Sequence, residues 1–357
     1  MCPLVKELQS SKQFETIVCV TGQHREMLDQ ILGCFQIVPE YDLCIMQPNQ
    51  TLFDVTLKTM LGTKEIIEKE KPDIVLVHGD TTSAFATALA CYYLKIPVGH
   101  VEAGLRTNNI YSPFPEEFNR QAIDLITKYY FAPTEDAKIN LIKEGKKQES
   151  VFVTGNTVID ALSTTISNTY ESNIINWCKG SRMILVTAHR RENLGEPMKN
   201  MFTAIRKIVN NFDDVKVVYP VHLNPLVQEM ANVCFGNHER IKLIEPMEMI
   251  DFHNLMANAY IIMTDSGGIQ EEAPSLGIPV LVMRDTTERP EGVAAGTLKL
   301  VGTDEIRIYS TVSELLSNSK KYQDMAKAKN PYGNGTASKQ IVAILNEKLN
   351  LGVNSNL

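Results

Sequence analysis

The 357 residues of this chain are 44% hydrophobic and 22% charged, and the formal net charge is -7. This length allows two domains of ordinary size, each with its own core, and no apolar run approaches the roughly 18 residues that span a bilayer. We expect no binding to a membrane or to nucleic acid, so any phosphate site must be local. Seven isolated cysteines and the absence of a secretory pattern at the start favour a cytoplasmic location.

Short apolar, β-branched runs alternate with longer helical patterns along the whole chain. Residues 1–8 already have a helical pattern, with no strand before them. Strands are predicted over Thr16 to Thr21, Ile74 to His78, Ile96 to Val101, Tyr129 to Ala132, Val151 to Thr154, Met183 to Ala188, Val215 to Tyr219, Ile241 to Ile244, Tyr260 to Thr264, Pro279 to Met283 and Leu298 to Val301.

The continuous apolar character of these runs predicts strands that are covered on both faces. With helices between them, they form parallel βαβ units, and we predict an α/β fold with two doubly wound parallel-sheet domains. The polar stretch Ser163 to Arg182 is the expected connection, which gives domains over 1–162 and 163–336. Ligands of such sheets bind beyond the carboxyl ends of the strands, where this chain repeatedly places polar residues and glycines.

The first domain has no predicted strand at its start. In a doubly wound domain the first strand normally lies in the middle of the sheet. We therefore expect that this strand is missing from the chain and that its place, between the strands at 16–21 and 74–78, is vacant. A direct hydrogen-bonded pairing of those two strands would contradict this expectation.

The segment from Tyr260 to Glu272 predicts a diphosphate site. An apolar strand leads into Ser266-Gly267-Gly268, and the unpaired amides of a helix start attract phosphate oxygens, with the Ser266 hydroxyl as an added donor. Glu272 lies one helical turn beyond Gly268, where its carboxylate could bind both hydroxyls of a ribose. The alternative is a capped helix in a protein that binds no nucleotide.

Three carboxylates follow strands or lie in the loops after them: Asp80, Glu102 and Glu116. Carboxylates gathered in a partly desolvated site can acquire different pKa values and act as acid and base. As alternatives, Asp80 could cap the helix that begins near Thr82, and Glu116 could occupy the first turn of its own helix.

Basic residues follow other strands. His189 and two arginines after it could clamp or protonate a departing pyrophosphate, or form a solvated basic corner. His222 and Arg289 are weaker candidates. The histidine spacings do not predict a metal site, and without Gly-x-Gly-x-x-Gly a nicotinamide site is not expected.

Six sequence blocks carry a family resemblance that covers almost the whole chain. Together they closely resemble the non-hydrolysing bacterial UDP-N-acetylglucosamine 2-epimerases. The blocks are Gly79-Asp-Thr-Thr, His100-Val-Glu-Ala-Gly-Leu-Arg-Thr107, Tyr111-Ser-Pro-Phe-Pro-Glu-Glu-Phe-Asn-Arg120, Gly155-Asn-Thr-Val-Ile-Asp160, Ala188-His-Arg-Arg-Glu192 and Thr264-Asp-Ser-Gly-Gly-Ile-Gln-Glu-Glu-Ala-Pro274.

The resemblance implies a GT-B architecture, two Rossmann-like domains with the active site between them, and a final helix, residues 337–357, that returns to the first domain. It implies a homodimer and an isomerase that needs no cofactor and no metal. The implied reaction converts UDP-N-acetylglucosamine reversibly to UDP-N-acetylmannosamine, a precursor of cell-surface polysaccharides. UDP is eliminated across C1 and C2 to give 2-acetamidoglucal and then adds back.

The resemblance also implies roles for individual residues. Asp80, Glu102 and Glu116 would supply the acid/base chemistry, without an assignment to either face of the sugar, and His189 would assist the departing diphosphate. Ser266, Gly267 and Gly268 would hold phosphate, Glu272 the ribose, Phe252 and the backbone near Met247 the uracil, and Arg289 another part of the nucleotide. Gln23, Arg190 and His222 match positions that bind a second, activating UDP-N-acetylglucosamine in some members.

The chain departs from the family at its start. The first strand and a following Gly-Thr-Arg-Pro-Glu loop with a nearby lysine have no counterpart in this sequence. In the family, the arginine of this loop and the lysine help bind the substrate. Three alternatives stay open: a hydrolysing 2-epimerase, a GT-B glycosyltransferase that uses the same nucleotide sugar and, because the basic loop is missing, an inactive nucleotide-sugar-binding protein.

Overall fold

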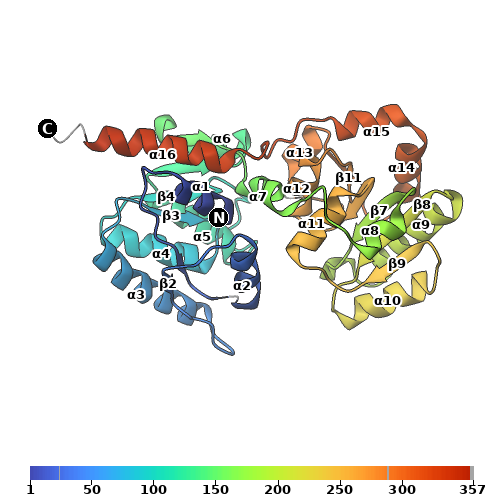
Figure 1. The fold of residues 1–357 in the computed structure, drawn as a ribbon, viewed down its shortest axis with the longest axis horizontal. Helices are drawn as coiled ribbons and strands as arrows, with labels where there is room; N and C mark the ends of the chain where they lie inside the picture. Colours follow the sequence, from blue (N-terminus) through green and yellow to red (C-terminus); the bar gives the residue numbers. More distant parts are fainter. Residues whose placement is uncertain (24, 288, 354–357) are drawn as a thin grey trace. The chain divides into compact units, whose positions relative to one another are not determined.

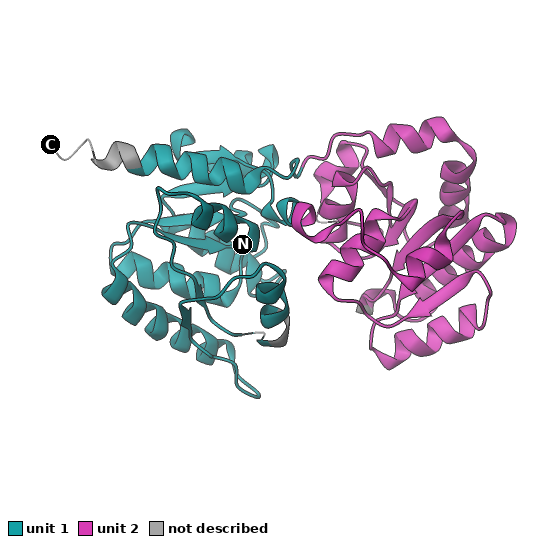
Figure 2. Cartoon of the chain, viewed as in Figure 1, with its two compact units in different colours: residues 1–161, 332–357 teal, residues 162–331 magenta. Residues whose placement is uncertain are grey.

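The computed structural model describes residues 1–23, 25–287 and 289–353. The chain forms two compact units, of which unit 1 comprises Met1–Ala161 and Tyr332–Leu357, and unit 2 comprises Leu162–Pro331 (Figure 2). The chain thus leaves unit 1 inside helix α7 (Thr157–Thr165). The polar stretch 163–182, expected as the connection, belongs to unit 2.

Unit 1 is built on a parallel sheet of order β3-β4-β5-β6. These strands are Val75–His78, Val98–Val101, Tyr129–Ala132 and Val151–Val153. The helices of unit 1 other than α7 are α1 (Cys2–Ser10), α2 (Arg25–Cys34), α3 (Leu52–Glu70), α4 (Thr82–Tyr93), α5 (Glu116–Ile126), α6 (Glu135–Lys143) and α16 (Ala337–Val353), with a 3-10 turn, η1 (Gln148–Ser150).

A second, two-stranded parallel sheet in unit 1 joins β1 (Cys19–Val20) to β2 (Tyr41–Asp42). β1 occupies only the end of the strand predicted over 16–21, and β2 was not predicted. Within the described residues β1 pairs with β2 and β3 pairs with β4, so the β1–β3 pairing that would contradict the expected gap does not occur.

The N-terminal helix and the last helix of unit 1 lie side by side (Figure 1). The predicted helix at residues 1–8 is confirmed, because α1 spans Cys2–Ser10. Its buried Leu4 and Leu8 pack with Ile341 and Leu345 of α16 against the sheet residues Val101 and Phe131. The amides of Ala337 and Ser338 at the start of α16 donate to the carboxylate of Asp160, which fixes this helix on unit 1.

Unit 2 contains a six-stranded parallel sheet of order β12-β11-β10-β7-β8-β9. The strands are β7 (Arg182–Thr187), β8 (Val215–Pro220), β9 (Ile241–Ile244), β10 (Ile261–Thr264), β11 (Val280–Val282) and β12 (Leu298–Leu300). The helices are α8 (Asn173–Cys178), α9 (Glu196–Asn211), α10 (Pro225–Phe235), α11 (Met249–Ala257), α12 (Ile269–Ser275), α13 (Pro290–Ala294), α14 (Glu305–Ser317) and α15 (Ser319–Ala326), with a 3-10 turn, η2 (Arg191–Asn193).

The order of this sheet reverses between β7 and β10. The chain builds outward from β7 through β8 and β9, then returns to the other side of β7 with β10. Apolar side chains cover both faces, with Phe202 of α9 in one core and Leu255 of α11 in the other. In open parallel sheets, ligands bind at the carboxyl ends of the strands that flank such a reversal. A ligand of unit 2 is therefore expected to bind at the residues that follow β7 and β10.

Candidate active site

A buried carboxylate stands at the strand reversal of unit 2. Asp265 follows β10 directly and is fully buried. Its oxygens accept hydrogen bonds from the backbone amides of His189 and Arg190, at 3.0 and 2.9 Å, and from the side-chain amide of Asn193 at 3.0 Å. Its backbone carbonyl accepts from Nε of Arg190 at 3.0 Å. Asp265 thus holds the loop after β7 against the end of β10.

His189 lies on this loop and is partly exposed. Its Nδ1 is 3.3 Å from the Asp265 carboxylate, and its ring meets the ring of His222 edge-on, with centroids 5.5 Å apart. Burial lowers the pKa of His189; the Asp265 carboxylate opposes this effect, whereas His222 and Arg190 add to it. The imidazole is therefore mainly neutral at neutral pH and can take a proton when an anion binds beside it.

The glycine-rich turn after Asp265 has the shape expected for a helix start. The Thr264 hydroxyl accepts from the amide of Ser266 at 2.9 Å, and Gln270 donates to the Ser266 carbonyl at 2.9 Å. Gly268 is the N-cap of the short helix α12 and is exposed. These bonds fix the turn on which Gly267 and Gly268 present their backbone.

Glu272 lies on α12 beside a buried histidine. One carboxylate oxygen is 3.6 Å from Nε2 of His253, whose Nδ1 is in turn 2.7 Å from the hydroxyl of Thr165. His253 belongs to α11, which begins next to Met247, and Phe252 of the same helix is half-buried. The structure thus brings Glu272 close to α11, the helix that carries Phe252, one of the predicted uracil contacts.

Arg289, the predicted nucleotide contact, directly precedes α13 and contacts α12. Its guanidinium pairs with the buried carboxylate of Glu271 on α12, and its amide donates to the hydroxyl of Thr287, which donates to Gln270. Arg289 therefore braces the helix that follows the glycine turn.

In unit 1, Asp80 is held by α5. Nη2 of Arg120 donates to the Asp80 carboxylate at 2.6 Å, and the side-chain amide of Asn119 donates to the Asp80 carbonyl at 2.9 Å. The alternative that Asp80 caps the following helix is wrong, because the cap of α4 is Thr81, whose hydroxyl accepts from the amide of Ala84. The Asp80 side chain is 26% exposed.

The same arginine contacts Glu117, a fully buried carboxylate at 3.2 Å from Nη1 of Arg120. Burial alone would raise the pKa of Glu117, but the amides of Thr107 and Asn108, the side chain of Gln121 and the charge of Arg120 lower it below its ordinary value. Glu117 is therefore an ionised anchor between α5 and the loop after β4.

Glu102 occupies a strained backbone position directly after β4. Its φ of 69° lies in the left-handed region, which a residue with a side chain adopts rarely and at a cost of order 1–3 kcal/mol. One carboxylate oxygen accepts from the side-chain amide of Asn156 at 3.1 Å, and the other is 3.9 Å from Nε2 of His78. Such strain is typical of functional sites.

Gly79 lies between the ends of β3 and β4. Its φ is 66°, and a Cβ atom at this position would come within 3.1 Å of the Glu102 carboxylate. Glycine therefore allows the Glu102 carboxylate to approach the residue that precedes Asp80. The structure thus brings Asp80 and Glu102 to neighbouring strand ends.

The two remaining predicted residues of unit 1 lie on the surface around these strand ends. Glu116 is the first residue of α5, as the alternative interpretation expected, and is partly exposed one helical turn before Arg120. The side chain of Gln23 accepts a hydrogen bond of 2.8 Å from Ser83 near the start of α4.

Sequence reasoning did not select several residues that organise the site. Arg120, Glu117, Asn156 and Asp265 all lie inside the six quoted blocks, yet their role depends on partners that are distant in the sequence. The sequence offered one signal for these residues: each is a charged or amide residue in one of the quoted sequence blocks, and all but Asn156 share their block with a predicted site residue.

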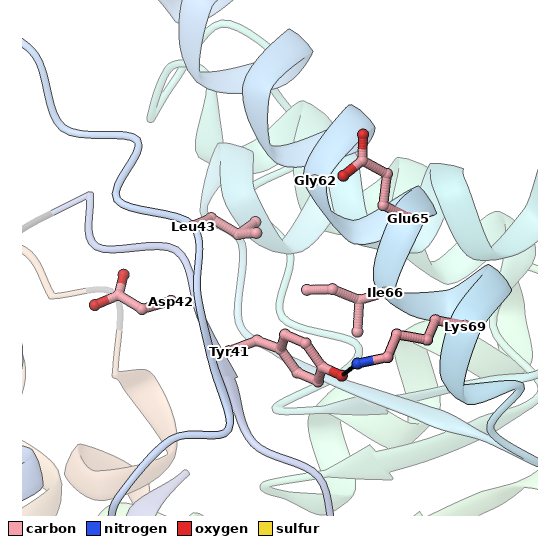
Figure 3. A pocket seen from close by; sticks show the side chains of 7 residues that line it. All are labelled: Tyr41, Asp42, Leu43, Gly62, Glu65, Ile66 and Lys69. Atoms are coloured by element: carbon pink, nitrogen blue, oxygen red, sulfur yellow. Dashed lines mark hydrogen bonds between the residues drawn. The ribbon is translucent and has the colours of Figure 1, made fainter.

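A surface hollow elsewhere in unit 1 contains none of the predicted site residues. Figure 3 shows it between the β2 region and α3, with the side chain of Lys69 reaching the hydroxyl of Tyr41. Its lining residues are Tyr41, Asp42, Leu43, Gly62, Glu65, Ile66 and Lys69. Nothing in its lining suggests a reaction.

A six-stranded parallel sheet with a glycine turn, a buried aspartate and a histidine at its reversal is typical of nucleotide-binding α/β enzymes. The chain belongs to the UDP-N-acetylglucosamine 2-epimerase family, which matches residues 6–346. The predicted membership is thus confirmed. No helix in the described residues is long and apolar enough to cross a membrane.

Individual relatives agree with this assignment. The chain is 59% identical to the UDP-N-acetylglucosamine 2-epimerase of Bacillus subtilis over 342 residues, 96% of this chain and 90% of the relative. It is similar to the Staphylococcus aureus protein MnaA solved with UDP, at 50% identity and a TM-score of 0.88, over 98% of this chain and 93% of that one.

A UDP-N-acetylglucosamine 2-epimerase from Neisseria meningitidis bound to UDP-N-acetylglucosamine is 48% identical, with a TM-score of 0.84 over 97% of this chain and 95% of that one. The predicted fold class, a GT-B architecture with two parallel-sheet domains, is confirmed by this similarity and by the two sheets.

Proposed function

We propose that this chain interconverts UDP-N-acetylglucosamine and UDP-N-acetylmannosamine without hydrolysis. A base removes the C2 proton, the C–H electrons form a C1=C2 double bond, and the C1–O bond to UDP breaks. UDP then adds back to C1 while an acid delivers a proton to the other face of C2. The observation that carries this proposal is the pair of carboxylates at adjoining strand ends, Asp80 and Glu102, in a chain of this family.

The reaction explains why carboxylates are needed. The C2 proton is only weakly acidic, so removal and return on opposite faces require two positioned groups. Asp80 is hydrogen-bonded to an arginine and Glu102 to an asparagine, which gives the two groups different environments. Glu116 completes the acid/base set in this proposal.

The UDP group binds in unit 2 in this proposal. Ser266, Gly267 and Gly268 hold phosphate, Glu272 binds the ribose, and Met247 and Phe252 contact the uracil. His189, neutral before binding, donates to the departing diphosphate once it is protonated. Arg289 contributes through the position of α12 as well as any contact of its own, because it pairs with Glu271.

A second UDP-N-acetylglucosamine acts as an activator in this proposal, through Gln23, Arg190 and His222. This proposal rests on their match with family positions and on the edge-on contact between the rings of His222 and His189. Initial rates that depend sigmoidally on substrate in the parent protein and hyperbolically in His222→Ala are expected. Hyperbolic rates in both would count against an activator.

We also infer a cytoplasmic homodimer. All seven cysteines are unpaired, as suits a reducing compartment. Phe53, Leu57 and Leu61 form an exposed apolar stripe on α3, with exposed fractions of 81%, 53% and 57%, and such stripes mark protein interfaces. Light scattering should give twice the chain mass of 40.0 kDa. Leu57→Glu should lower it, unlike the control Ile306→Glu, and a monomeric parent protein would rule the dimer out.

The central test follows the sugar by NMR. The full chain in heavy water should convert UDP-N-acetylglucosamine to a mixture with UDP-N-acetylmannosamine, with deuterium at C2. Asp80→Asn and Glu102→Gln should each abolish exchange, whereas the exposed control Glu239→Gln should not. UDP with free sugar would indicate a hydrolysing enzyme, and transfer to an added acceptor a glycosyltransferase. A protein that binds the nucleotide sugar without exchange at C2 would be an inactive binder.

A further inference from the structure

A buried histidine connects the strand ends of unit 1. His100 lies on β4, opposite Val77 of β3, and its side chain is completely buried. Its Nε2 is 2.9 Å from the carbonyl oxygen of Gly79, and its Nδ1 is 2.7 Å from the carboxylate of Asp124 on α5. A carbonyl and an ionised carboxylate only accept hydrogen bonds, so both ring nitrogens of His100 donate.

The surroundings of Asp124 support its ionised form. Its second oxygen accepts from Nη2 of Arg106 at 2.7 Å and from the amide of Gly104 at 3.3 Å. Burial alone would raise the pKa of Asp124, but His100 and Arg106 lower it. Burial alone would lower the pKa of His100, but Asp124, the Gly79 carbonyl and Glu102 raise it. The hydrogen-bond geometry and the directions of both pKa shifts indicate that His100 and Asp124 form a buried ion pair.

Other charged groups face this pair. Arg106 also donates to both carboxylate oxygens of Glu144, at 2.6 and 2.7 Å, so its guanidinium lies between two carboxylates. His78 is close enough for its own pKa to be lowered by His100, after the larger effects of burial and of the N-terminal amine. His100 is therefore part of a charged network with Arg106, Asp124, Glu144 and Glu102.

The Gly79 carbonyl links this network to the predicted acid/base residues Asp80 and Glu102. Gly79 precedes Asp80 and adopts the left-handed conformation, and its Cα faces the carboxylate of Glu102. Asp80 is held from the other side by Asn119 and Arg120 of α5, the helix that carries Asp124. The peptide group between Gly79 and Asp80 is thus fixed by His100, and the side chain beyond it by Arg120.

We propose that His100 is a positioning residue for the acid/base carboxylates: its Nε2–H group fixes the Gly79 carbonyl, and thereby sets the orientation of Asp80 relative to Glu102. The Nδ1–H bond to Asp124 stabilises the charged ring, in which Nε2 also carries a proton to donate. The proposal rests on the proposed function, because it assigns a role within the same reaction. A misplacement of about 1 Å in a reacting group can cost about 100-fold in rate.

Two variants separate the two ring nitrogens. His100→Gln can place an amide donor near the Nε2 position and keep the bond to Gly79, whereas His100→Asn can donate only near Nδ1, to Asp124. We expect His100→Asn to lower kcat about 100-fold with KM and UDP affinity nearly unchanged, and to alter the pH dependence of kcat. His100→Gln should retain most of kcat. Ile67→Ala, a core truncation on α3, controls for lost stability and should leave kcat per folded molecule unchanged.

The proposal is overturned if His100→Asn keeps kcat and its pH profile, or if His100→Gln is as impaired as His100→Asn. Nitrogen-15 NMR of labelled histidine in the unaltered protein supplies a measurement that needs no variant to fold. Both His100 nitrogens should carry protons at pH 7.5, and a neutral ring would overturn the proposal. Absence of C2 exchange in the unaltered protein would instead refute the proposed function, while the nitrogen signals would still report on His100.

Discussion

Arg120 donates from Nη2 to the carboxylate of Asp80 at 2.6 Å while its Nη1 lies 3.2 Å from the buried carboxylate of Glu117. One guanidinium therefore couples a candidate reacting group to the anchor of the loop after β4. A planar guanidinium with several donors can do this, and a shorter neutral amide cannot.

Arg120→Gln should lower kcat about 100-fold, because Asp80 loses the partner that orients it and Glu117 loses its nearby charge. Steady-state rates by NMR, with the folded fraction measured by circular dichroism, check this. Arg206→Gln, at an exposed arginine of α9, is the matched control and should behave like the unaltered protein. Equal rates for both variants would show that Arg120 does not orient a catalytic group.

The strands were largely predictable because they are continuous apolar runs with helices between them. Those at 129–132 and 241–244 match the prediction at both ends. The short β2, Tyr41–Asp42, was not predictable, since its two residues form no apolar run and it pairs only with β1. The change of unit inside α7 has no signal in composition, because helical periodicity continues across it.

The candidate site residues in unit 1 could be predicted because the ends of the strands that precede them could be predicted. Asp80 and Glu102 could be selected because polar residues after parallel strands meet at one edge of the sheet. The partners Arg120 and Asn156 could not, since each is about 40 to 54 residues away along the chain and is brought there by tertiary packing. Arg289 was selected from the sequence, but its pairing with Glu271 could not be predicted from it.

UDP binding should be accompanied by proton uptake at His189. Its pKa lies below the ordinary value in the free protein, and a diphosphate nearby favours the charged ring and raises it. UDP affinity should therefore increase as the pH falls from about 7 to 6, around the ordinary histidine pKa. Calorimetry in buffers of different ionisation enthalpy measures the protons taken up.

The control for this experiment is His189→Gln, which retains a donor but cannot titrate. The nucleotide's own phosphate titration is common to both proteins, so the difference between them reports on His189. A buffer dependence that is identical in the two proteins would contradict protonation of His189 on binding.

Glu272 should be coupled energetically to the ribose hydroxyls. Glu272→Gln is expected to weaken UDP binding about tenfold, close to 1.4 kcal/mol, with little effect on kcat, because the contact exists before and after the C1–O bond breaks. A double-mutant cycle with 2′-deoxy-UDP and 3′-deoxy-UDP tests the contact directly. At least one deoxy compound should lose less affinity in Glu272→Gln than in the unaltered protein, and full additivity for both would remove Glu272 from the ribose site.

The buried pair of His100 and Asp124 should stabilise unit 1 over a defined range of pH. The pKa of Asp124 is lowered in the folded state and that of His100 is raised. The Asp124 carboxylate therefore stabilises the folded state at pH values above its pKa in the unfolded chain. This stabilisation is lost as the pH falls through its pKa in the folded state. The His100 imidazole stabilises the folded state at pH values below its pKa in the unfolded chain. This stabilisation is lost as the pH rises through its pKa in the folded state. Both contributions are complete between about pH 4 and pH 6.5.

Asp124→Asn should lower the free energy of unfolding by about 3–5 kcal/mol at pH 5.5, because His100 and Arg106 remain buried without their shared anion. Urea denaturation at several pH values measures this cost, and the fully exposed Asp213→Asn is the matched control. The cost should shrink as the pH rises through the folded-state pKa of His100, where the ring loses its charge. A loss below about 1 kcal/mol would contradict a charged His100, since an average substitution already costs about 1 kcal/mol.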